Sequence, residues 1–118
     1  MTIKEIYNLA IQKGIETDFR GKAFIEKNLL CKREKFAKLS EKEKQGFDQE
    51  SLSHPYSDTR ILHIANDKPI KKVLVGIDID VGEILLSKEL GDIDLVISHH
   101  PMGRALGDMH EVMDLQAD

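Results

Sequence analysis

The fold is decided around the stretch Ile93-Asp94-Leu95-Val96-Ile97-Ser98-His99-His100-Pro101-Met102-Gly103. Its apolar and β-branched centre, residues 95–97, predicts a short buried strand. Pro101 has no N–H for a sheet ladder and favours extended geometry at His100, so we expect the strand to stop at the two histidines. Both imidazoles would then lie at the carboxyl end of the strand, which is the edge where open α/β sheets bind ligands.

The paired histidines predict a metal site. Neighbouring strand residues point to opposite faces, so His99 and His100 converge only if the chain bends, which Pro101 and Gly103 favour. Neutral imidazole is the commonest protein ligand for transition metals, and we expect both side chains to bind a divalent ion such as zinc, iron or manganese. The alternative is one packed and one exposed imidazole without a metal.

A second apolar strand precedes the histidines. Residues 71–79 form a continuous apolar run, of the kind that is buried on both faces of a sheet. Residues 81–90 are amphipathic, which predicts a helix between two parallel strands. The carboxyl ends of the strands should then lie side by side, so that Asp78 can orient one of the imidazoles. Asp80 precedes the helix and is expected to cap it.

Polar residues after the histidines are further candidates. Arg104 lies in a loop with two glycines, where it could clamp a phosphate or carboxylate of a substrate or pair with Asp108 on the surface. His110 and Asp114 are four residues apart and could share a cation, although a solvated helix face explains them more simply.

The last ten residues, 109–118, predict a helix with an apolar face made by Val112, Met113 and Leu115. This pattern stops without a glycine, lysine or proline signal, which indicates a fragment of a longer protein or a truncated reading frame. We expect the apolar face to be covered by further residues or by another chain. Self-association into a homo-oligomer is therefore predicted.

The N-terminal half of the chain predicts helices over residues 2–14, 22–39 and 40–46. Capping boxes open the first and the last of these, with Thr or Ser followed three residues later by Glu. We expect Gly14 to end the first helix.

A loop over residues 48–59 separates these helices from the sheet. Residues 60–65 are a strand candidate, on which His63 would face away from the metal. We therefore expect an α/β fold, with N-terminal helices followed by a small mixed sheet. It would form either a single domain or an N-terminal fragment, in which residues 1–47 are helical and residues 60–118 hold the strand–helix–strand unit.

The chain has 118 residues, of which 41% are hydrophobic and 32% charged, and a net charge of −4. Residues 61–118 hold five Lys and Arg against eleven Asp and Glu, which suits a cation site and argues against a nucleic-acid surface. The single cysteine, Cys31, excludes an internal disulfide and a cysteine zinc site. No segment is long enough to span a bilayer and no signal peptide opens the chain, so a cytoplasmic protein is expected.

Residues 71–79 and 94–101 together resemble the Nif-three-like family, also described as dinuclear metal-centre proteins or as GTP cyclohydrolase I type 2. In that family a strand–helix–strand unit ends in a His-His-Pro signature whose histidines bind a metal pair. The resemblance implies the first half of the Nif-three-like fold, a centre of two metal ions held in part by His99 and His100, and ring-shaped oligomers. The family's other ligands lie beyond the positions that this chain covers.

Three functions are compatible with these features. The first is a metal-dependent hydrolase acting on a nucleotide or another phosphorylated small molecule, with His99 and His100 on the metal, Asp78 orienting an imidazole and Arg104 holding substrate. No general base or nucleophile can be assigned from the sequence. The second is a non-catalytic metal-binding or protein-interaction module. The third is a structural fragment without a metal.

Overall fold

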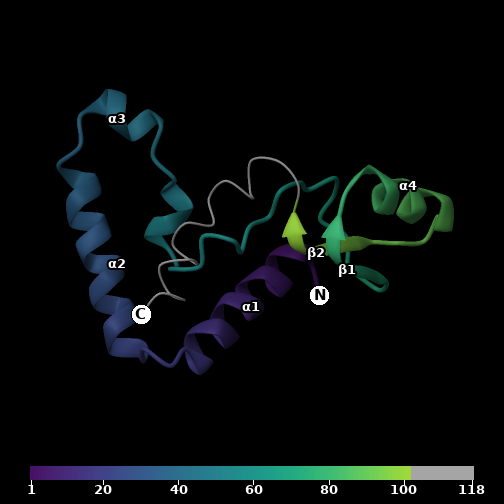
Figure 1. Cartoon of the computed structure of the whole chain (residues 1–118), viewed down its shortest axis with the longest axis horizontal. Coiled ribbons are helices and arrows are strands. Elements are labelled where there is room, and N and C mark those ends of the chain that lie inside the picture. Colours follow the sequence, from purple (N-terminus) through teal and green to yellow (C-terminus); the bar gives the residue numbers. More distant parts are fainter. Residues whose placement is uncertain (102–118) are drawn as a thin grey trace. The chain divides into compact units, whose positions relative to one another are not determined.

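The computed structural model describes residues 1–101, which form helices and a small sheet (Figure 1). In chain order the elements are α1 (Ile3–Thr17), α2 (Lys22–Ala37), α3 (Glu41–Gln45), the 3-10 helix η1 (Gln49–Leu52), β1 (Val73–Ile79), α4 (Val81–Leu90) and β2 (Leu95–Pro101). These elements confirm the predicted combination of helices and sheet. None of the helices within residues 1–101 is long and apolar enough to cross a lipid bilayer.

The chain divides into two compact units. The helical unit is Leu9–Ser57, and the sheet unit is Met1–Asn8 with the described residues from Asp58 on. The boundary at Ser57 falls in the loop that the sequence predicts between helices and sheet.

In the sheet unit, β1 and β2 pair in parallel, as the strand–helix–strand pattern predicts (Figure 1). The register sets Val75 opposite Ile97 and Asp78 opposite His100. The Asp94 carboxylate fixes the amino end of the pair, since its Oδ2 accepts the backbone N–H groups of Lys71 and Lys72 at 2.9 Å each. These two hydrogen bonds lower the pKa of Asp94.

The helix between the strands begins and ends as its sequence indicates. The Asp80 side chain accepts a hydrogen bond from the N–H of Gly82, and the Glu83 carboxylate accepts one from the N–H of Asp80. This capping box confirms the predicted role of Asp80. Gly91 ends the helix in the left-handed conformation, with φ of 75°, which glycine adopts without strain.

Two expectations about strand extent are wrong. β2 does not stop at the histidines but continues through them to Pro101, which lies opposite Ile79. A proline is tolerated on an edge strand, and within residues 1–101 the side of β2 that faces away from β1 has no neighbouring strand. Residues 60–65 form no strand, because no other strand in the described part of the chain pairs with them, and Leu62 and Ile64 are exposed.

The expectation that β1 is buried on both faces is also wrong. The side chains of Val75 and Ile77 are 68% and 64% exposed, and only Ile79 at the end of the strand is buried. Among the described residues the sheet has two strands and packs with one helix, which are too few partners to cover both faces. Within residues 1–101 the sheet is purely parallel rather than mixed.

In the helical unit, α1 extends past Gly14 to Thr17. The sequence predicts an end at Gly14, but here the glycine makes room for the ring of Tyr56, since a Cβ at position 14 would lie 2.9 Å from Tyr56 Cε2. Ile25 and Leu29 of α2 are buried, as the helical spacing predicts. Arg33 ties α2 to η1 by donating its Nε–H to the carbonyl of Leu52 at 2.9 Å.

Candidate metal centre

The parallel register brings the predicted site residues together. Asp78 lies near the end of β1, and its partner on β2 is His100. The two strands arrive side by side because α4 connects them within one strand–helix–strand unit, so residues 22 positions apart become neighbours. The proximity of Asp78 to a histidine, predicted from the pattern alone, is confirmed.

Asp78 holds the His100 ring through one nitrogen. Its Oδ1 lies 3.1 Å from His100 Nδ1. A carboxylate only accepts hydrogen bonds, so in a neutral imidazole Nδ1 carries the proton and the lone pair resides on Nε2. Carboxylates orient metal-binding histidines by this arrangement, which fixes the tautomer and raises the basicity of the other nitrogen.

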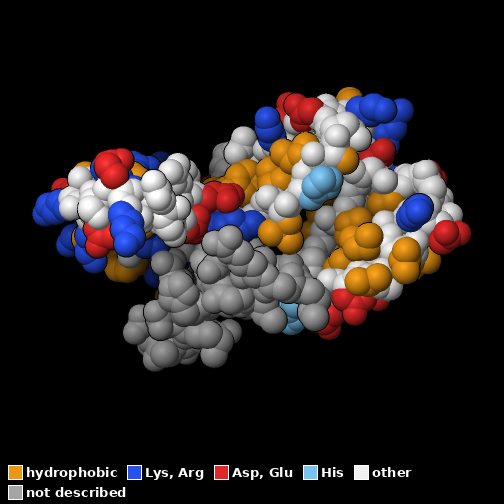
Figure 2. Space-filling view, turned by 90° about the horizontal axis from the view of Figure 1, so that it is seen from above, with side chains coloured by type: hydrophobic (Ala, Val, Ile, Leu, Met, Phe, Trp, Pro, Cys, Tyr) orange, Lys and Arg blue, Asp and Glu red, His pale blue; other side chains and the backbone are white. Residues whose placement is uncertain are grey.

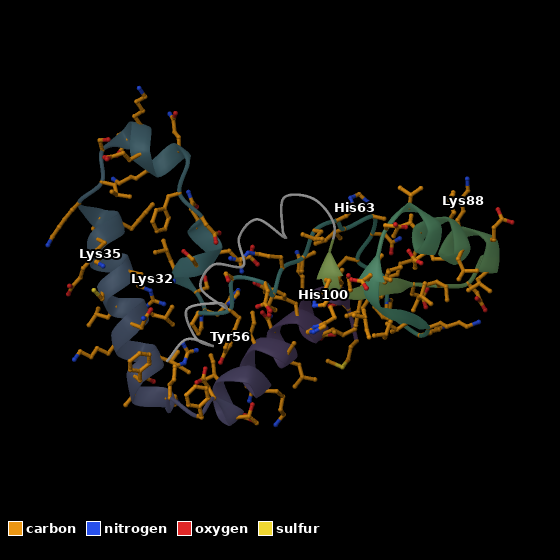
Figure 3. All side chains as sticks on the ribbon, in the orientation of Figure 1. Lys32, Lys35, Tyr56, His63, Lys88 and His100 are labelled. Atoms are coloured by element: carbon orange, nitrogen blue, oxygen red, sulfur yellow. The ribbon has the colours of Figure 1, made fainter. Side chains whose placement is uncertain are left out.

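His99 and His100 lie together although they are consecutive residues of a strand. Their ring centroids are 4.5 Å apart and the ring planes are inclined by 30°, so the two imidazoles face one another. Neither is packed in a core, because His99 is exposed and the side chain of His100, labelled in Figure 3, is 44% exposed. The alternative of one packed and one exposed imidazole does not describe this pair.

The facing rings determine which metal arrangement these histidines fit. An imidazole lone pair lies in the plane of its ring, so the stacking of two rings does not by itself aim both lone pairs at one point. Two ions in dinuclear sites are about 3.5–4 Å apart, a spacing similar to the ring separation here. The ring separation is therefore compatible with one ion for each imidazole.

The described residues offer fewer ligands than a firmly bound metal ion needs. No group of three or more His, Cys, Asp or Glu side chains in residues 1–101 is arranged to hold an ion. Catalytic zinc sites use three protein ligands. The donor set of His99 and His100 fits a divalent ion chemically, but further ligands are needed to bind it firmly.

Ser98 adds a polar group that sequence reasoning did not assign. Its Oγ is buried and has no hydrogen-bond partner among the described residues. Strand alternation places Ser98 on the same face as His100, opposite Gly76 of β1 in the register. The only sequence signal for this residue is its position beside the histidines.

Several predicted site residues are not placed at this centre. Arg104, Asp108, His110 and Asp114 lie outside the described residues, as do the apolar positions predicted for the helix over 109–118. His63 is exposed and lies apart from His100 (Figure 3).

A second polar cluster, which the sequence does not predict, lies in the helical unit. Asp18 accepts hydrogen bonds from the Arg20 guanidinium at 2.9 and 2.7 Å and from the Tyr56 hydroxyl at 3.1 Å. The Arg20 hydrogen bond is the main cause that lowers the pKa of Asp18 to about 2, and burial, aided by Asp18, raises the pKa of Tyr56 to about 12.

Nearby in the sequence, His54 is 1% exposed, and its Nδ1 accepts the backbone N–H of Tyr56 at 3.2 Å. The His54 contact lies within this loop, and the hydrogen bond from Tyr56 to Asp18 joins the loop to the turn between α1 and α2. Perturbed pKa values often mark functional sites. Here the Arg20 hydrogen bond accounts for the shift of Asp18 and burial for most of that of Tyr56, so a structural role is sufficient to explain the cluster.

Comparison of the chain with protein-family models, with curated proteins and with solved structures found no match.

Proposed function

We propose that this chain binds divalent transition-metal ions through His99 and His100, with Asp78 as the residue that orients His100. The observation that carries the proposal is the facing pair of imidazoles with a carboxylate on Nδ1 of one of them. The acidic balance of residues 61–118 favours cations over anions. The arrangement suits two ions, with one histidine on each.

We further propose that the chain is of the Nif-three-like type and that its complete site is hydrolytic, acting on a nucleotide or another phosphorylated small molecule. The support is the sequence resemblance together with the parallel strand–helix–strand unit on which the histidines lie. Metal ions in such a site lower the pKa of a bound water and stabilise the charge that develops on a phosphoryl oxygen. His99 and His100 would bind, Asp78 would fix the tautomer of His100, and Arg104 would hold the substrate phosphate.

A non-catalytic metal-binding module is the second candidate. The observation that favours it is the small donor set, because residues 1–101 offer two imidazoles and no arranged group of three ligands. The exposure of His99 and of Asp78, whose side chain is 81% exposed, also leaves the centre open to water. Catalysis in metal sites depends on a shaped and partly dry cavity.

One experiment addresses both proposals. The chain is purified without added metal, loaded with Zn²⁺ or Mn²⁺, and analysed for bound metal and for hydrolysis of a generic phosphomonoester. We expect metal to be retained by the unaltered protein and by His63→Ala, and to be lost in His99→Ala and His100→Ala.

Hydrolysis that needs metal and disappears in His99→Ala would support the proposal that the protein is a metal-dependent hydrolase. Bound metal without hydrolysis would support the second candidate, a non-catalytic metal-binding module. Equal metal retention by all four proteins would refute the site.

A further inference from the structure

In the part of the chain that the structure describes, the side of β1 that faces away from β2 is an open edge. Within residues 1–101 the sheet contains only these two strands, and no backbone hydrogen bond joins that side of Val73–Ile79 to another segment. Unpaired N–H and C=O groups on an edge strand are a template for pairing with another strand. Two-stranded sheets are marginal alone, so an additional strand would stabilise this one.

If two copies of β1 are laid antiparallel with Val75 at the centre, residues of matching type lie opposite each other. Lys72 precedes the apolar run and Asp78 follows it, at equal distances from Val75. Val73 and Ile77 are likewise symmetric about Val75, and all three apolar side chains lie on the same face of the strand and are exposed. Figure 2 shows hydrophobic side chains at the surface around the sheet and α4.

We propose that a second copy of this chain pairs antiparallel with the open edge of β1, with Val75 opposite the partner's Val75. In this register Lys72 lies opposite the partner's Asp78, and Val73 lies opposite the partner's Ile77. A two-fold axis perpendicular to the sheet relates the copies, so each favourable pair occurs twice. The result is a four-stranded sheet in the order β2-β1-β1-β2.

The opposite charges of Lys72 and Asp78 favour a second copy of this chain over an unrelated strand. Directly opposite residues of antiparallel strands are near neighbours, and opposite charges there stabilise the pairing. The side chains of Lys72 and Asp78 are 56% and 81% exposed. Asp78 contacts His100 Nδ1 through Oδ1, so the partner's Lys72 would pair with its other carboxylate oxygen, Oδ2. The present partner of Lys72 is Asp92 at 2.6 Å, an exposed ion pair of a kind that contributes little stability and can exchange.

The proposal does not depend on metal binding. The two share Asp78, but His100 lies on the other edge of β1 and the backbone pairing needs no metal, so loss of metal would leave the new pairing possible.

Cysteine cross-linking tests the register. The only native cysteine is Cys31, which is replaced by serine to give the background protein. Opposite residues of antiparallel strands have Cα atoms about 4.5–5.5 Å apart, which permits a disulfide. Val75→Cys should therefore form a covalent dimer on mild oxidation, because position 75 lies opposite itself.

Val73→Cys is the matched control, on the same strand and the same face. In the proposed register, residue 73 of one copy lies four residues along the strand from residue 73 of the partner. Their Cα atoms are then about 13 Å apart, which is too far for a disulfide. Val73→Cys alone should remain monomeric on a denaturing gel, whereas a mixture of Val73→Cys and Ile77→Cys should cross-link. Sedimentation of the unaltered protein should show a dimer that dissociates on dilution.

A monomer mass for the unaltered protein at all concentrations would overturn the proposal. Equal cross-linking of Val75→Cys and Val73→Cys would also overturn it, since it would indicate unspecific aggregation. Cross-linking of neither variant, in samples whose circular dichroism matches the unaltered protein, would overturn it as well and show that this edge is covered by another segment or partner.

Discussion

Replacement of Asp18 by asparagine should destabilise the helical unit in a pH-dependent way. The carboxylate is 5% exposed and accepts hydrogen bonds from Arg20 and Tyr56. Asparagine keeps the shape of the side chain but removes the charge that pairs with Arg20. The loss can be calculated from the pKa of Asp18, which is lowered from 3.8 to about 2, mainly by the Arg20 hydrogen bond.

This shift corresponds to about 2 kcal/mol of folding free energy. Because the folded pKa lies below the unfolded value, the contribution is fully present above the unfolded pKa of 3.8. It decreases as the pH falls from there through about 2, where the folded carboxylate takes up a proton. The variant should therefore be less stable by about 2 kcal/mol near pH 7 and by about 1 kcal/mol near pH 3.

Urea unfolding of both proteins at several pH values measures this difference. Tyr56→Phe is the control, because it removes one hydrogen bond to Asp18, at a cost of about 1 kcal/mol, and leaves the Arg20 pair in place. A deficit of Asp18→Asn that is the same near pH 3 as near pH 7 would refute the electrostatic explanation. It would show that the variant loses packing rather than charge.

Three further predictions concern single residues. Gly14→Ala should destabilise the helical unit by about 1–3 kcal/mol, since its Cβ would lie 2.9 Å from the Tyr56 ring, and a raised melting temperature would contradict this. Asp80→Ala should cost about 1 kcal/mol by removing the cap of α4, measured by thermal unfolding, and unchanged stability would show that the capping box is not needed. Asp78→Ala should weaken Zn²⁺ binding by about 10–100-fold in calorimetry, and unaltered affinity would mean that Asp78 does not orient His100.

The features of the fold that follow from local rules could be predicted from the sequence. Capping boxes at Ser40 and Asp80 set the starts of α3 and α4, and the alternation of apolar strand, helix and apolar strand predicted the parallel pair. The approach of Asp78 to a histidine follows from that topology, because parallel strands joined by a helix end at the same edge.

What could not be predicted depends on contacts between distant residues. Gly14 has the sequence signature of a helix end, but the close approach of Tyr56, 42 positions later, makes it an interior helix residue. The hydrogen bonds of Asp18 with Tyr56 likewise join residues 38 positions apart. Pro101 suggested that β2 stops early, whereas β2 is an edge strand of the sheet that residues 1–101 form, and an edge strand allows a proline inside it.

Imidazole ¹⁵N spectra recorded during a Zn²⁺ titration test the central claim, metal binding at His99 and His100, most directly. Before metal is added, His100 should show a protonated Nδ1 and an unprotonated Nε2, because Asp78 accepts the Nδ1 proton. On titration the Nε2 resonance of His100 and one ring nitrogen of His99 should shift, while those of His63 and the buried His54 should not. Spectra in which His99 and His100 do not respond, or in which His63 responds equally, would contradict a metal centre at this strand pair.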